Sequence, residues 1–148
     1  PHEIHDQEVA SYGGMFIGTS VKGVASDNTH VTDMSVMFCM SKATTLDLGS
    51  LDTSNVTNMN SMFSASKATT LDLGSLDTSK VTDMPLMFEG SKATTLDLSR
   101  FDTSNVTDMN SMFYNSQATT GYARTQADAD KFNSSSNKPA GLNFVVKP

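Results

Sequence analysis

The sequence predicts an α/β repeat protein: a solenoid of about four 25-residue repeats, with a parallel strand ladder on one side and short helices on the other. The first observation is that residues 41–65, 66–90 and 91–115 are near-identical copies of one unit. Only a stacked structure gives every copy the same surroundings, so equivalent side chains should lie directly above one another. The second observation is that four apolar columns recur at this spacing: Val31, Val56, Val81 and Val106; Met34, Met59, Met84 and Met109; Met37, Met62, Met87 and Met112; and Phe38, Phe63, Phe88 and Phe113.

Each copy is expected to open with a short strand that buries one face. In residues 45–48, Thr-Leu-Asp-Leu, the leucines alternate with polar residues, so Leu46 and Leu48 point to one side and Thr45 and Asp47 to the other. The next two residues, Gly-Ser, end the strand. Strands of successive copies would pair in parallel about 4.8 Å apart.

The second half of each copy predicts a turn followed by a short helix. The side chains of residues 52–55, Asp-Thr-Ser-Asn, bond readily to nearby backbone N–H groups and favour a turn. Apolar residues then follow at spacings of three, three and one, which is typical of one or two helical turns. Pro85 is tolerated only in the first turn of a helix, so that helix should begin near Thr82 or Asp83. If these segments are extended instead, the fold is a strand-only β-helix.

The two ends should close the stack, because terminal coils otherwise expose core and unpaired strand edges. Thr125 followed by Asp128 resembles a helix N-cap, and we expect a helix to about Phe132 and a closing strand at Leu142–Val146. Near the N-terminus, Met15–Val24 fits an irregular first strand region. The expected organisation is an N-terminal segment or cap at 1–18, a solenoid at 19–120 and a C-terminal cap at 121–148.

Residues Leu96–Phe113 read LDLSRFDTSNVTDMNSMF, and this motif resembles the 26-residue-type repeat of bacterial surface proteins, a BspA-like family grouped with leucine-rich repeats. The resemblance covers about residues 27–120, and residues 122–133 are similar to the usual C-terminal cap. It implies a leucine-rich-repeat-like solenoid on an extracellular protein, at the cell surface or attached to the cell wall. The repeat here has 25 residues instead of 26, and alanine stands where a leucine-rich repeat usually starts with leucine, at Ala43, Ala68 and Ala93.

Composition and motifs argue against several classes of function. The net charge of −6 argues against nucleic-acid binding and against docking on anionic lipid. No stretch approaches the ~20 apolar residues needed to insert into a membrane. The sequence also lacks a nucleophile motif, a phosphate loop and an isolated carboxylate pair, so we expect no enzyme activity and no cofactor. We also expect the chain to be a monomer.

Metal binding is not predicted either. The stretch that starts at Asp102 fails as an EF-hand loop, because it lacks glycine at the sixth place and has Phe113 at the twelfth. Carboxylates and hydroxyls are nevertheless suitable calcium ligands, so calcium remains an open question. His2, His5 and Asp6 form a further metal candidate near the N-terminus.

One outward-facing column suggests a binding surface. Asp47, Asp72 and Asp97 lie mid-strand with no turn to cap, and carboxylates about 4.8 Å apart repel by roughly 1 kcal/mol even in water. Either the lysines near the start of each copy offset that repulsion or a ligand does. The aspartates at 52, 77 and 102 begin a turn and are expected to be structural. The predicted ligand-binding residues form a polar strip: Thr45, Asp47, Thr70, Asp72, Thr95, Asp97 and Tyr122.

The leading hypothesis is a cell-surface adhesion module that binds a host or matrix protein or glycan. The alternative is a passive spacer that displays another domain, which the near-identity of the copies also fits. Copies 41–65 and 66–90 differ only in the turn, helix and following loop. If sequence differences between copies mark the recognition surface, that surface lies on the helical side instead of the strand side. Ice binding by threonine ladders is a third hypothesis, but the adjacent aspartates spoil a flat threonine array.

Overall fold

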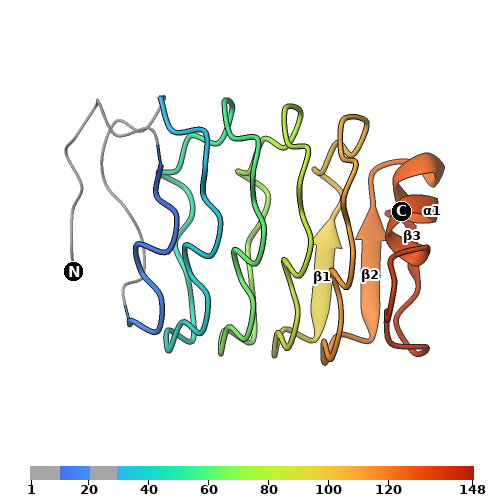
Figure 1. The fold of residues 1–148 in the computed structure, drawn as a ribbon. Coiled ribbons are helices and arrows are strands. Elements are labelled where there is room, and N and C mark those ends of the chain that lie inside the picture. The colour runs from blue at the N-terminus through green and yellow to red at the C-terminus, as the bar shows by residue number, and fades with distance from the viewer. Residues whose placement is uncertain (1–10, 21–29) are drawn as a thin grey trace.

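A computed structural model describes residues 11–20 and 30–148 of the chain. In Figure 1 the chain runs along the molecule as a row of coils, each lying beside the next, and a helix lies at the C-terminal end of the row. The regular elements are β1 (Thr95–Leu98), β2 (Thr120–Ala123), α1 (Gln126–Asn133) and β3 (Phe144–Val146). The three strands pair in parallel in the order β1-β2-β3, with Asp97 opposite Tyr122 and Tyr122 opposite Val145.

Equivalent phenylalanine rings stack along the row and form the centre of the core. The ring centroids of Phe38 and Phe63 are 6.0 Å apart, those of Phe63 and Phe88 are 5.8 Å apart, and those of Phe88 and Phe113 are 6.1 Å apart. The ring planes deviate from parallel by 10° or less in these pairs. The centroid distances lie within the range at which aromatic rings attract each other. All four rings are fully buried. The prediction that equivalent side chains lie above one another is confirmed.

The methionine segments form turns, and the predicted short helices are wrong. The N–H groups of Met34 and Val36 donate to carbonyls of the next coil, at Asn58 and Asn60, while the N–H of Met37 donates back to Met34. Val36 has a φ of 60°, in the left-handed region that an α-helix excludes. The segments are not strands either. Their backbone groups are satisfied between coils, and apolar spacings of three fit this ribbon of turns as well as a helix.

On this side the coils are joined without a break. Isolated parallel bridges link residue 11 to 33, 33 to 58, 58 to 83 and 83 to 108. Residues 11–20 make the same turns as the later copies, since Phe16 N–H donates to the Met37 carbonyl and its ring stacks on Phe38 at 5.7 Å. The expected strand region at Met15–Val24 is therefore wrong over its described part, and residues 21–24 lie outside the described residues.

The predicted strand ladder is present only at the C-terminal end of the row. Leu46 and Leu48 are buried and Thr45 and Asp47 exposed, as the alternation predicts, yet residues 45–48 and 70–73 are not strands. Residues 70–73 make no hydrogen bond with the facing edge of β1 among the described residues. β1 pairs with β2, which pairs with β3 on its other side, whereas the earlier copies have no such support, and a lone pair of short strands is marginal.

Polar side chains close each turn of a coil by accepting the backbone N–H two residues further on. In the copy at 66–90, Ser66 accepts from residue 68 at 3.2 Å, Asp72 from residue 74 at 3.0 Å and Asp77 from residue 79 at 2.9 Å. In other copies a fourth corner is closed in the same way, as Asp33 accepts from residue 35 at 2.8 Å. The structural role expected for the aspartates at 52, 77 and 102 is confirmed.

The C-terminal cap has the helix and strand that the sequence predicts. Thr125 caps α1 by accepting from the N–H of Asp128, and α1 buries Ala129 and Phe132 against the last coil. β3 then adds to the sheet beside β2. Gly121 stands in the column of inward leucines because a Cβ there would lie 2.6 Å from the Phe144 ring.

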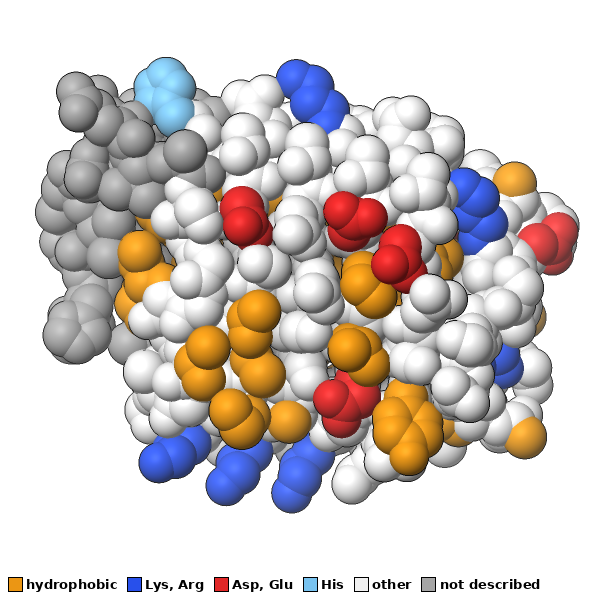
Figure 2. All heavy atoms as spheres, in the orientation of Figure 1, with side chains coloured by type: hydrophobic (Ala, Val, Ile, Leu, Met, Phe, Trp, Pro, Cys, Tyr) orange, Lys and Arg blue, Asp and Glu red, His pale blue; other side chains and the backbone are white. Residues whose placement is uncertain are grey.

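Few large apolar side chains reach the surface of the described residues. On the face drawn in Figure 2, hydrophobic side chains form patches among polar atoms. Most of the exposed large apolar residues belong to the turn segments or to β3, so the turn side, the alternative recognition face in the sequence analysis, offers some apolar contact area. The exposed large apolar residues are Met15, Ile17, Met40, Tyr114, Val145 and Val146.

Candidate functional site

The predicted polar strip lies on the strand side of the row and faces outward. Its members from the first two copies, Thr45, Asp47, Thr70 and Asp72, are exposed, and so is Thr95. The last two members, at positions 97 and 122, are half-buried and lie opposite each other in the register of β1 and β2. The structure therefore places all seven side chains on one face.

The strip aspartates differ from the prediction in one respect, because each of them does cap a turn. Asp47 accepts the N–H of residue 49, and Asp72 the N–H of residue 74, both at 3.0 Å. Asp97 accepts both the N–H and the hydroxyl of Ser99, at 3.0 and 2.5 Å. Sequence reasoning treated Gly49 only as a strand breaker and so missed this turn. Each of these bonds uses Oδ1, which leaves Oδ2 for other contacts.

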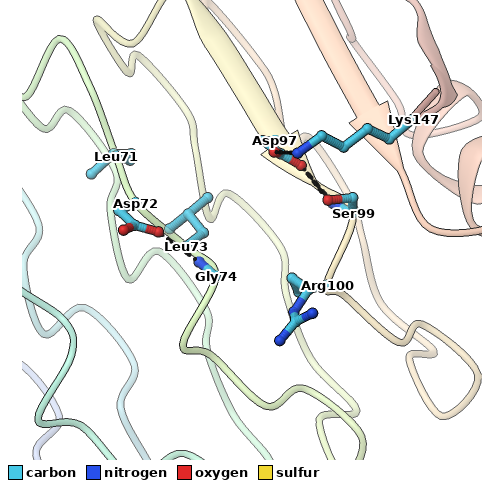
Figure 3. A pocket seen from close by; sticks show the side chains of 8 residues that line it. All are labelled: Leu71, Asp72, Leu73, Gly74, Asp97, Ser99, Arg100 and Lys147. Atoms are coloured by element: carbon cyan, nitrogen blue, oxygen red, sulfur yellow. Dashed lines mark hydrogen bonds and ion pairs between the residues drawn. The ribbon is translucent and has the colours of Figure 1, made fainter.

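The surface is hollowed between the second and third copies, next to the unpaired edge of β1. This strand-face groove has a volume of about 570 Å³. A smaller hollow of about 210 Å³ shares Leu71 and Asp97 with it and is bordered by the threonines at 69, 70, 94 and 95. In Figure 3 Asp72 and Asp97 lie on neighbouring coils with open space between them. The strand-face groove is lined by Leu71, Asp72, Leu73, Gly74, Asp97, Ser99, Arg100 and Lys147.

Charges in the strand-face groove are only partly paired. Lys147 reaches Asp97 from beyond β3, with 2.6 Å between Nζ and Oδ2 (Figure 3). Burial raises the pKa of Asp97, but the hydrogen bonds from Lys147 and Ser99 outweigh it, so the pKa lies below its usual value. Arg100 is exposed and has no ion pair among the described residues. The groove thus offers an unpaired guanidinium beside the exposed carboxylate of Asp72.

Sequence reasoning missed Arg100 and Lys147. Arg100 carried a usable signal, because it breaks the repeat at a position where Ser50 and Ser75 stand in the other copies. Lys147 carried none, because it reaches Asp97 only through the pairing of β3 with β2, fifty positions away in the chain.

A second polar cluster joins the last coil to α1. The buried Asp128 accepts hydrogen bonds from the N–H and hydroxyl of Thr103, from the hydroxyl of Thr125 and from Arg124. Burial raises the pKa of Asp128, yet these bonds prevail and lower it to about 2. The same helix donates from Lys131 to the Thr103 carbonyl at 2.6 Å. The carboxylate of Asp128 is engaged on both oxygens within the cluster, which therefore acts as an anchor between the last coil and α1.

The described residues contain neither a cluster of metal ligands nor a membrane-spanning helix. Within residues 11–20 and 30–148, no three His, Cys, Asp or Glu side chains gather where they could hold a metal ion. In the same part of the chain, no helix has the length and apolar character required to cross a bilayer. The metal candidate at His2, His5 and Asp6 lies outside the described residues.

Comparison with known proteins identifies a family. No curated protein and no solved structure matches the chain. Residues 11–125 match the family described as Mycoplasma protein of unknown function, DUF285. The match begins in the first described turn segment and ends at the N-cap of α1, so it spans all of the repeats. The chain therefore belongs to the family of Mycoplasma proteins of unknown function, DUF285.

Proposed function

We propose that the chain is a leucine-rich-repeat-like solenoid of the BspA-like type, which acts as a non-enzymatic binding module on a bacterial cell surface. The strand side holds a host or matrix protein or glycan. The observation that carries this proposal is the strand-face groove, because its volume of about 570 Å³ lies within the range of known ligand sites. It is bordered by members of the polar strip, and its unpaired Arg100 supplies a directional donor.

The state of the carboxylates supports binding over catalysis. A general acid needs a pKa raised toward neutrality. The pKa of Asp52 is lowered by hydrogen bonds from Ser54, and that of Asp102 by hydrogen bonds from Ser104. The pKa values of Asp97 and Asp128 are lowered as well. Carboxylates of this kind stay charged at neutral pH and act as hydrogen-bond acceptors.

The proposed setting is extracellular, on the cell surface or attached to the cell wall, with the chain acting as a monomer. A single cysteine, Cys39, excludes a disulfide within the chain. Stability therefore comes from the stacked rings and from backbone bonds between coils.

The test is a binding screen against immobilised mucin, matrix proteins and glycans, using the chain and variants of the groove. Arg100→Ser introduces the residue of the other two copies, so it removes the guanidinium at little structural cost. Asp72→Asn with Asp97→Asn removes both charges but keeps an oxygen that can cap each turn. Asp77→Asn is the matched control, since it changes an equivalent turn cap outside the groove lining. We expect Arg100→Ser to weaken binding at least several-fold and Asp77→Asn to leave it unchanged.

A passive spacer is the second candidate function. It is favoured by the bridges that join every coil from residue 11 to residue 108, which would make the row stiff along its length. A negative result across the whole screen would support the spacer. Binding that no groove variant alters would retain the module but remove the groove as its site.

A further inference from the structure

Three lysines form an evenly spaced row along one edge of the molecule. The backbone N–H of each donates to a carbonyl of the preceding coil, at 2.9 Å for Lys42, 3.1 Å for Lys67 and 3.3 Å for Lys92. These bonds hold the lysine backbones at the spacing of neighbouring strands, about 4.8 Å. Figure 2 shows cationic side chains in a row along its lower edge. We call the three residues the lysine edge.

The charges of the lysine edge are not neutralised by the described residues. All three side chains are exposed, and none of their ammonium groups makes an ion pair or hydrogen bond with another described residue. The ion pairs between described residues are made by Arg124 and Lys147. Like charges at this spacing repel each other, and the chain as a whole has a net charge of −6. The lysine edge is therefore a concentrated line of positive charge on an acidic protein.

Free hydroxyl groups lie beside the lysine edge. Two or three residues after each lysine comes a pair of exposed threonines, at 44–45, 69–70 and 94–95. Within the described residues, the hydroxyls of these threonines make no hydrogen bond. By contrast, the hydroxyls of Thr57 and Thr107 each donate to the coil before, both at 3.3 Å. The threonines at 69, 70, 94 and 95 also border the hollow of about 210 Å³.

We propose that the lysine edge and its threonine pairs bind a linear acidic polysaccharide that carries about one negative group per sugar. One sugar extends such a chain by about the distance between neighbouring strands, so successive negative groups meet successive lysines. The hydroxyls donate to the same groups or to sugar oxygens. This inference rests on the proposed function in so far as both place the ligand on the strand side, but it depends on the lysine edge and not on Arg100.

The test measures binding of the chain to polygalacturonate, which carries one carboxylate per sugar, to chondroitin sulfate, whose alternating carboxylates and sulfates also average one negative group per sugar, and to neutral dextran. We expect binding to one or both acidic chains, with log affinity falling against log salt at a slope of about 2 to 3, and none to dextran. Lys67→Gln should weaken binding about fivefold, and replacement of all three lysines by glutamine should abolish it. Lys80→Asn is the matched control, because it removes one positive charge but introduces the residue of the other copies.

Equal effects of Lys67→Gln and Lys80→Asn would overturn the proposal, since net charge alone would then explain the binding. Competition by duplex DNA as strong as by the acidic polysaccharides would overturn it too. Binding of an acidic glycan that Arg100→Ser weakens and the lysine variants do not would support the strand-face groove and reject the lysine edge. Unchanged thermal unfolding midpoints for the lysine variants would exclude misfolding as the cause of a loss.

Discussion

Thr103 forms with the carboxylate of Asp128 the hydrogen bond that earlier threonines form with the backbone of the next coil. In earlier copies the buried threonine hydroxyl both donates to and accepts from the residue that opens the next turn, as Thr78 does with Asp102 at 3.0 and 2.8 Å. Thr103 has no further coil beside it, and its hydroxyl donates to Asp128 at 2.6 Å instead. The cap therefore continues the bonding pattern of the repeats with a side chain from α1.

Replacing this carboxylate should destabilise the protein. Asp128→Ala leaves the buried donors of Thr103 without a partner, and we expect the free energy of unfolding to fall by about 2 to 4 kcal/mol. Denaturant unfolding followed by circular dichroism measures the loss. Asp130→Ala is the control, because that exposed carboxylate accepts one hydrogen bond, from Gln126. Equal losses in the two variants would contradict the anchoring role.

Stability should also depend on pH through the same group. The pKa of Asp128 is lowered to about 2 from 3.8, so its contribution is complete above about pH 4 and is lost as the pH falls toward 2. That shift corresponds to about 2 kcal/mol. The lowered pKa values of Asp52, Asp97 and Asp102 act in the same direction. As the pH is lowered from 6 to 2, the free energy of unfolding should fall less steeply for Asp128→Asn than for the unaltered chain.

The contact between Gly121 and Phe144 should limit which residues the cap accepts. Gly121→Ala places a Cβ 2.6 Å from the Phe144 ring, so the cap must shift, and we expect a loss of about 1 to 3 kcal/mol. Adding Phe144→Leu to Gly121→Ala should recover part of that loss, although Phe144→Leu alone is destabilising. Thermal unfolding of the three variants tests this. Purely additive losses would show that the clash is not the cause.

At turn positions with a left-handed backbone, alanine should be less favourable than glycine for the free energy of unfolding. Gly90 has a φ of 64°, and a Cβ there would make only ordinary van der Waals contacts with Ala65, the nearest at 3.6 Å, so Gly90→Ala should cost about 1 kcal/mol from the backbone alone. Ala65, one copy earlier, has a φ of 53°. Ala65→Gly should therefore leave the free energy of unfolding unchanged or raise it. A loss of 0.5–1 kcal/mol, as is usual for Ala→Gly in regular structure, would argue against turns at these positions.

The sequence predicted the contents of the core and of the cap far better than the shape of the coil. Columns such as the stacked Phe63 and Phe88 follow from the repeat itself, and the Thr125 cap follows from local chemistry. Whether Met59–Phe63 is a helix or a ribbon of turns depends on bonds to the neighbouring coils. The spacing of apolar residues within one copy does not reveal those bonds.

The candidate site was predictable as a face but not as a set of contacts. Outward alternation was enough to place Asp72 and Asp97 on one side. The i to i+2 bond from Gly74 to Asp72 is a local feature that closer reading of the turn could have found. The pairing of Lys147 with Asp97 depends on how β3 docks, which is a property of the folded cap.

Because Asp128 provides the hydrogen bond that a further coil would provide, the number of coils in such a protein can change. Thr53, Thr78 and Thr103 present the same hydroxyl, so α1 could seat on any of the copies that precede it. Deleting residues 66–90 would bring Phe63 onto Phe113 and leave the terminus intact. Gain or loss of whole units by recombination between the near-identical copies would then yield shorter or longer folded proteins without any redesign of the ends.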